Sequence, residues 1–246
     1  MGQRATFGVL AVAFAAVASP AAPARAQPSD AESCANGTTT IIAIEACTRV
    51  IDRWGAANAR IAWAFYQRGN ALTLRRDYDG AIADYGIAIA LRPDYALAYS
   101  DRGLAYFARR EFPRAIEDYD QAIRLDPLYP TAYESRCYSL AILGQTARAL
   151  KDCDRALSLS PADPIFLDSR GYAHLRRGEL ARAIQDYNAA LKLYPELDTA
   201  LFGRAVAEAA RGNRNQAVHD LARARKLNPE FDRQMAQIHV SAPAGM

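Results

Sequence analysis

Residues 96–129 read ALAYSDRGLAYFARREFPRAIEDYDQAIRLDPLY, and this stretch decides the fold because its pattern recurs along the chain. Its closing Leu-x-Pro returns every 34 residues, at Leu91/Pro93, Leu125/Pro127, Leu159/Pro161, Leu193/Pro195 and Leu227/Pro229. Two alanine columns keep the same step: Ala81, Ala115, Ala149, Ala183 and Ala217, then Ala88, Ala122, Ala156, Ala190 and Ala224. A fixed period of this length indicates a repeat protein, in which each unit packs on its neighbours.

Each copy predicts two helices joined by a turn. In the quoted unit, residues 96–108 carry apolar and aromatic residues at three- and four-residue spacing, which is typical of a helix with one packed face. A second helix over 115–125 ends before Pro127, whose ring cannot continue a helix. Because one helix pair cannot bury its apolar faces alone, the units must stack into an all-α solenoid.

Small residues in both helices are expected to let the pair approach closely. The first helix has a small column that faces the alanine column of the second helix: Gly69, Gly103, Gly171 and Ala205. Bulk that fills the gap to a neighbouring repeat is expected from Tyr85, Tyr119, Tyr187 and Leu221.

These columns resemble the tetratricopeptide repeat (TPR) pattern, as in Tyr99, Gly103, Tyr106, Ala115, Tyr119, Ala122 and Pro127. The resemblance covers residues 62–229 and implies a right-handed superhelical solenoid of stacked antiparallel helix pairs. One column departs from the family pattern, because an arginine precedes the small residue in every copy where a large apolar residue is usual. The five repeats are placed at 62–95, 96–129, 130–163, 164–197 and 198–231.

The two ends of the repeat array depart from the period. Residues 43–51 parallel 81–89 at a separation of 38 rather than 34, so a degenerate N-terminal capping repeat is expected over 27–61. After the last repeat, residues 232–246 are expected to hold a short capping helix and a loose tail.

The first 26 residues are typical of a signal peptide. A basic start precedes an apolar run over 5–18, and a Pro/Ala segment ends in Ala24-Arg25-Ala26. An apolar interfacial helix is the alternative, but the small-x-small site favours cleavage after Ala26. We therefore expect a periplasmic or secreted protein in an oxidising compartment. No other stretch is apolar over eighteen residues, so stable membrane insertion is not expected.

Composition and motifs exclude several classes of function. Apolar residues make up 51% and charged residues 23% of the chain, as in an ordinary globular protein. The net charge of +3 is too balanced for a nucleic-acid binder that relies on counterion release. No nucleophile elbow, phosphate-binding loop, dinucleotide fingerprint or HExxH motif occurs. His174 replaces an aromatic column member and is expected to pack rather than act as a base, so we predict no enzyme, cofactor or metal site.

Two invariant charged columns accompany the small residues. The arginines are Arg68, Arg102, Arg136, Arg170 and Arg204, and the aspartates are Asp84, Asp118, Asp152, Asp186 and Asp220. A row of ligand-binding charges is one interpretation. Their position beside the close-packed small residues favours an internal ion-pair ladder instead, in which each arginine donates two parallel bonds to the aspartate of its own repeat.

The four cysteines break their columns in pairs. Cys137 replaces the small residue and Cys153 the tyrosine of one repeat, so bulk gained by one helix matches bulk lost by the other. Cys47 occupies the tyrosine column of the cap, and Cys34 lies where the first helix of the cap is expected. We predict disulfides Cys34–Cys47 and Cys137–Cys153 among three connectivities, with reduced buried thiols as the alternative. The spacings do not suit zinc, and no histidine accompanies them.

The first helices are expected to line a concave surface that is apolar and aromatic. We predict that this surface binds a protein or peptide through Trp63, Tyr66, Asn70, Leu104, Phe107, Glu134, Tyr138, Asp168, Tyr172 and Phe202. TPR proteins that hold a C-terminal carboxylate use Lys and Asn at set positions, and only Asn70 matches, so a peptide with apolar anchors is favoured. Coverage of this stripe by the ends of the chain or by a second copy is the alternative.

The sequence therefore predicts a non-catalytic periplasmic scaffold that holds another envelope protein. Two other classes stay open. One is a self-associating structural protein of the envelope, and the other is an accessory subunit of an enzyme complex.

Overall fold

The computed structural model describes residues 29–36 and 39–230, and this part of the chain is helical without a β-strand. Its helices are α1 (Asp30–Asn36), α2 (Thr40–Trp54), the 3-10 helix η1 (Ala59–Ile61), α3 (Ala62–Leu74), α4 (Tyr78–Leu91), α5 (Ala96–Ala108), α6 (Phe112–Leu125), α7 (Pro130–Ile142), α8 (Thr146–Leu159), α9 (Pro164–Arg177), α10 (Leu180–Leu193), α11 (Asp198–Ala210) and α12 (Arg214–Leu227). The predicted signal peptide (1–26) and the predicted closing helix and tail (232–246) lie outside the described residues. None of the described helices combines the length and the apolar character needed to span a bilayer.

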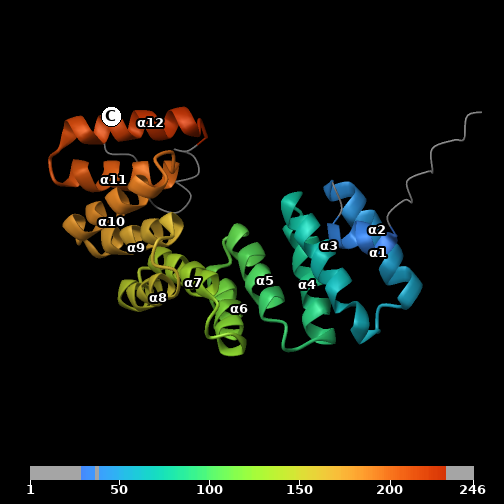
Figure 1. Ribbon diagram of the computed structural model, residues 1–246. Helices are drawn as coiled ribbons and strands as arrows, with labels where there is room; N and C mark the ends of the chain where they lie inside the picture. The colour runs from blue at the N-terminus through green and yellow to red at the C-terminus, as the bar shows by residue number, and fades with distance from the viewer. Residues whose placement is uncertain (1–28, 37–38, 231–246) are drawn as a thin grey trace, which may run out of the picture.

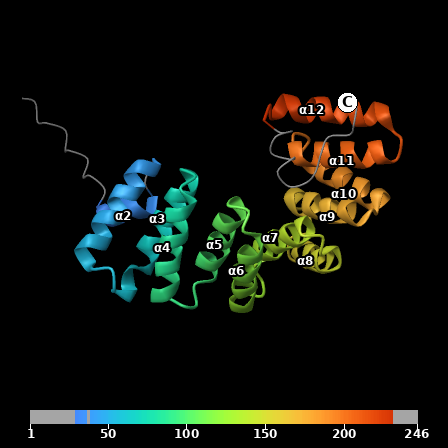
Figure 2. The ribbon, with the colours of Figure 1, turned by 180° about the vertical axis from the view of Figure 1, so that it is seen from behind.

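Each repeat is one antiparallel helix pair, and the pairs follow one another in chain order from α3/α4 to α11/α12 (Figures 1 and 2). The second helix starts slightly earlier than the sequence indicated: α6 begins at Phe112, with Pro113 in the first turn, where its missing N–H costs no hydrogen bond. The predicted all-α solenoid of stacked helix pairs is confirmed.

The inner surface of the solenoid is formed by the first helices of the repeats. Each of them contacts the first helix of the next repeat, along the series α3, α5, α7, α9 and α11. Within the described residues, the second helices of consecutive repeats make no such contact. Because the first helices lie closer together than the second ones, they occupy the concave side of the curve.

Each glycine of the small column makes room for the tyrosine of its own repeat. A Cβ atom added at Gly103 would lie 2.7 Å from Cε1 of Tyr119 and 3.2 Å from the carbonyl oxygen of Ala115. The same ring contact recurs between Gly69 and Tyr85 and between Gly171 and Tyr187. At Gly103 the small column faces the alanine column as expected, but the tyrosine ring is the closer neighbour, which the sequence did not indicate.

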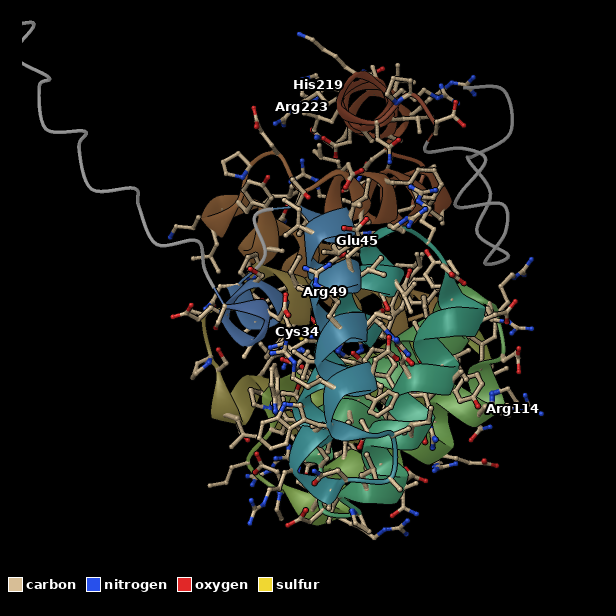
Figure 3. The ribbon with its side chains drawn as sticks, turned by 90° about the vertical axis from the view of Figure 1, so that its right-hand side faces the viewer. Cys34, Glu45, Arg49, Arg114, His219 and Arg223 are labelled. Carbon is tan, nitrogen blue, oxygen red and sulfur yellow. A yellow bond between two sulfur atoms is a disulfide. The ribbon has the colours of Figure 1, made fainter. Side chains whose placement is uncertain are left out.

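The capping repeat consists of α1 and α2, and the disulfide Cys34–Cys47 joins them with 4.6 Å between the Cα atoms. Figure 3 views this end, with Cys34 on α1 and the exposed side chains of Glu45 and Arg49 on α2. The second disulfide, Cys137–Cys153, joins α7 to α8 across 5.5 Å. Both pairings are those that the column exceptions indicated.

Candidate functional site

The residues predicted to line the concave surface differ in how much of them is open to solvent. Leu104 is 47% exposed. Seven others are partly buried: Trp63, Tyr66, Asn70, Phe107, Glu134, Tyr138 and Asp168. The expectation that Tyr172 and Phe202 present open rings is wrong, because their exposed fractions are 6% and 1%. Helix α9 packs more extensively on α7 and α11 than α5 does on its neighbouring first helices. Because these three helices are close together, they cover the side chains of Tyr172 and Phe202.

Three aromatic residues from successive first helices form a continuous row. The ring centroids of Phe107 and Tyr138 are 5.8 Å apart, and those of Tyr138 and Tyr172 are 5.0 Å apart. Phe107 also meets Phe112 of α6 edge-on at 5.3 Å. Tyr172 belongs to the main apolar core, and Phe107 and Tyr138 pack against that core, so the row joins the inner face to the core.

Open apolar side chains lie at the edges of this face. Leu97 and Leu104 on α5 are 44% and 47% exposed, and Ile165 on α9 is 45% exposed. Leu104 is one of the residues that the sequence placed on the concave side, and Leu97 and Ile165 also lie on first helices. Large apolar side chains left exposed together usually mark an interaction surface.

The N-terminal end of the array carries two hollows. Trp63 lines one of about 320 Å³ with Trp54 and Val50. Asn70 borders the other, of about 580 Å³, with Thr39 of the cap. The amide oxygen of Asn70 accepts a hydrogen bond from the hydroxyl of Tyr85 at 2.7 Å. The amide oxygen of Asn70 is therefore engaged inside its own repeat.

Two carboxylates lie at the middle of the inner face. Glu134 on α7 accepts hydrogen bonds from Ser169 at 2.5 Å and from Ser135 at 3.3 Å. Asp168 on α9 accepts one from Thr199 at 2.6 Å. Burial raises the pKa of Glu134 to about 7 and that of Asp168 to about 7, despite these hydroxyl donors.

A third carboxylate on this side, Asp101, was missed in the sequence. Its Oδ2 accepts a hydrogen bond from the hydroxyl of Tyr66 at 2.8 Å, and burial raises its pKa. The column of Asp101 contains Gln67, Ser135 and Ser169 in other repeats, so no recurring charge pointed to it.

The invariant arginines bind the aspartates of their own repeats. Nε and Nη2 of Arg102 donate to the two oxygens of Asp118 at 2.8 and 2.7 Å. The other four pairs repeat this fork: Arg68–Asp84, Arg136–Asp152, Arg170–Asp186 and Arg204–Asp220. All five aspartates are buried, so these charges are internal as predicted.

The ladder also links consecutive repeats, which the sequence analysis missed. Nη1 of an arginine reaches the preceding repeat, in the contacts Arg68–Thr48, Arg136–Asp120, Arg170–Asp154 and Arg204–Asn188. Gly86 occupies this position opposite Arg102, so no side chain from that site meets its guanidinium. The sequence contained the signal for this contact, because a polar acceptor lies two residues after most of the ladder aspartates, as at Asp120, Asp154 and Asn188.

His174 is held by acidic neighbours. Its Nδ1 lies 2.7 Å from Glu179, and its Nε2 lies 3.8 Å from Asp186 of the ladder. No group of three or more potential metal ligands occurs in residues 29–36 and 39–230. His174 is therefore held between a carboxylate of the following turn and one of the ladder.

Comparisons with known proteins identify the repeat. Family models described as TPR repeat and tetratricopeptide repeat match residues 64–109, 100–164 and 138–198, together more than half of the chain. A comparison with curated proteins finds no match.

Several solved structures have a similar fold. YrrB, described as a TPR protein with an unusual peptide-binding site, is 22% identical, with 80% of this chain and 100% of YrrB covered at a TM-score of 0.57. A tetratricopeptide repeat protein from Parabacteroides merdae is 16% identical over 85% of this chain and 84% of its own, at a TM-score of 0.68. The Cut9–Hcn1 complex matches at 15% identity over 80% of this chain and 41% of the matched chain, at a TM-score of 0.66.

Proposed function

The chain belongs to the tetratricopeptide repeat family, and on this premise we propose that it is a non-catalytic scaffold that holds a protein or peptide partner on its inner face. The observation that carries the proposal is the pair of open leucines on α5, Leu97 and Leu104, beside the aromatic row. Apolar anchors on a concave helical surface suit an extended or helical peptide. YrrB, which shares the fold, is a peptide binder by its description.

We also propose that the scaffold acts outside the cytoplasm, in the periplasm or as a secreted protein. The N-terminal segment with its Ala24-Arg25-Ala26 site supports export, and two disulfides suit an oxidising compartment. The test is the mass of the protein recovered from the cell envelope. A mature chain starting at Gln27, with Cys34–Cys47 and Cys137–Cys153 as intact cross-links, is expected, and an uncleaved cytoplasmic chain with four thiols contradicts it.

Capture of exported proteins on the immobilised chain tests the binding surface. Replacing Leu97 and Leu104 by Gln removes both apolar anchors, and because they are exposed the melting midpoint stays nearly unchanged. The matched control is Leu125→Gln with Leu128→Gln, two exposed leucines at the end of α6 and beyond it. Loss of capture in the first variant alone supports the inner face, whereas equal capture by both places binding elsewhere.

Two other functions remain as outcomes of the same work. A self-associating structural protein shows a concentration-dependent sedimentation coefficient without any partner. An accessory subunit of an enzyme complex captures an enzyme and changes its activity.

A further inference from the structure

The centre of the inner face contains two carboxyl groups that no cationic side chain among the described residues pairs with. Glu134 and Asp168 are bonded to three hydroxyl groups, of Ser135, Ser169 and Thr199, all of which are neutral donors. A carboxylate offers about four lone-pair sites, so both groups keep acceptor capacity. Paired or metal-bound carboxylates are the usual solution when such groups are buried.

The charged groups that act on these two carboxylates make the site more negative. Asp163 acts on Glu134, and both Glu134 and Asp198 act on Asp168. The nearby cation, Arg176, donates instead to the hydroxyl of Tyr172 at 3.0 Å and to the carbonyl oxygen of Ile142 at 3.3 Å. The guanidinium group of Arg176 is therefore engaged by these two oxygen atoms.

Two buried tyrosines, on the helices α6 and α10 that pack against α7 and α9, have hydroxyl groups without hydrogen bonds. Tyr119 and Tyr187 are 0% and 1% exposed, and neither hydroxyl oxygen has a partner with hydrogen-bonding geometry. The hydroxyl of Tyr187 lies against Gly203 on α11, and the charge of Asp168 acts on it. Tyr119 feels the charge of Glu134 in the same way. Hydroxyl groups without a hydrogen bond at 0–1% exposure are uncommon, and here both belong to tyrosines on helices that pack against the helices of the two acids.

An aromatic surface completes the site. The ring of Tyr138, one turn after Glu134 on α7, packs on the ring of Tyr172, one turn after Asp168 on α9, with 5.0 Å between centroids. A planar cation stacks well on such a ring and gains from the adjacent carboxylates. A guanidinium group has five N–H donors and no acceptor, which matches a site made of carboxylate and hydroxyl oxygens.

We propose that Glu134 and Asp168, with the ring of Tyr138, form a recognition site for an arginine side chain of the partner peptide, whose apolar residues contact Leu97 and Leu104. This inference rests on the proposed function and specifies that the partner carries a positive charge where it meets the site. The chain would thereby reverse the charge preference of a carboxylate clamp, because its own concave centre is acidic.

The test uses two synthetic peptides on the mature protein with its disulfides intact. Acetyl-Leu-Ala-Arg-Ala-Leu-amide is compared with the same peptide containing citrulline, which keeps the shape of arginine and lacks its charge. Isothermal titration at pH 8 is expected to show at least tenfold weaker binding of the citrulline peptide. Raising the salt concentration is expected to reduce this difference, since it screens the ion pairs.

Matched variants locate the effect. In Glu134→Gln with Asp168→Asn, the arginine peptide is expected to bind no better than the citrulline peptide. Glu117→Gln with Glu196→Gln removes the same charge from exposed positions and is expected to keep the preference within twofold. Equal binding of the two peptides to the wild type overturns the inference without relying on any variant.

The outcomes separate this inference from the proposed function. If the leucine variant loses the natural partner while Glu134→Gln with Asp168→Asn retains it fully, the scaffold function stands and the arginine site is wrong. If the arginine peptide binds only after Arg233 in the terminal segment is replaced by Ala, a residue of the chain itself fills the site, and recognition of a partner's arginine is overturned.

Discussion

The solenoid contains two sets of acids, one buried and one partly buried, that the fold treats in opposite ways. The ladder aspartates lie between the two helices of each repeat, and each is bound by an arginine through two hydrogen bonds. The inner-face acids Asp101, Glu134 and Asp168 are bonded to hydroxyl groups only. Burial raises the pKa of all three inner-face acids. Similar chemical groups are therefore compensated in one region and left uncompensated in the other.

The difference follows from what repetition requires. Every repeat must join its two helices and pack on its neighbours, so a structural device recurs at each step of 34 residues. A binding site is needed only once, so its residues are expected to break the columns. The column that holds Glu134 and Asp168 has Tyr66, Ser100 and Phe202 in the other repeats. In this chain the invariant charges form structural pairs, and the exceptional charges belong to the proposed recognition site.

Removing one ladder aspartate is expected to have the largest effect on stability. Asp118→Ala leaves Arg102 without a carboxylate, and Gly86 on the other side supplies no side chain to replace it. Breaking a buried pair costs about 3 kcal/mol, so the free energy of unfolding in urea is expected to fall by about this amount. Glu117→Ala on the exposed face of the same helix is the control. A loss below about 0.5 kcal/mol, the scale of a surface pair, contradicts an internal ladder.

The same change in the next repeat is expected to cost less. Asp152→Ala leaves Arg136 bonded to Asp120 at 2.6 Å, and the disulfide Cys137–Cys153 joins the same two helices one residue further along. We expect a loss of about 1–2 kcal/mol, since a partner and a cross-link remain. Reduction of the disulfides should increase the loss in Asp152→Ala more than in Asp118→Ala. Equal losses for both variants under oxidising conditions would show that the contact between repeats contributes nothing.

The raised pKa values of Glu134 and Asp168 predict that the free energy of unfolding falls as the pH rises. Unfolded Glu and Asp have pKa values near 4, whereas the folded values for Glu134 and Asp168 are about 7, so the folded state holds their protons more tightly. Their contribution to stability is complete below about pH 4 and is lost as the pH rises towards 7. Glu134→Gln with Asp168→Asn should therefore flatten the fall in unfolding free energy between pH 4 and 8. Urea titrations across this range measure it, and a slope identical to that of Glu117→Gln with Glu196→Gln argues against raised values.

The columns of the sequence predicted the register of the repeats, the partner of each ladder arginine and the cysteine pairs. All of these depend on contacts inside one repeat, where helix periodicity decides which side chains meet. The burial of Tyr172 and Phe202 could not be predicted, because it depends on how closely α7, α9 and α11 approach one another. That approach is set by packing between repeats, and a 34-residue period is the same whether neighbouring first helices are close or apart.

Removing a tyrosine hydroxyl is expected to have the smallest effect on stability. Its size is expected to differ among members of the same tyrosine column, according to whether the hydroxyl has a hydrogen bond. Tyr85 donates to Asn70 at 2.7 Å and lies 3.2 Å from the hydroxyl of Thr73, so Tyr85→Phe is expected to cost about 1 kcal/mol of unfolding free energy.

Tyr119 and Tyr187 lack these partners, because the positions of Asn70 and Thr73 hold Leu104 and Phe107 in one repeat and Tyr172 and Leu175 in the other. Removing a buried hydroxyl that has no hydrogen bond relieves its desolvation penalty, so Tyr119→Phe and Tyr187→Phe are expected to be neutral or slightly stabilising, by up to about 1 kcal/mol. Urea unfolding of the three variants side by side measures the difference. If all three lose stability equally, the two hydroxyls are bonded in solution. The orphaned pair would then no longer support a ligand at the inner face, and the recognition site would depend on the carboxylates alone.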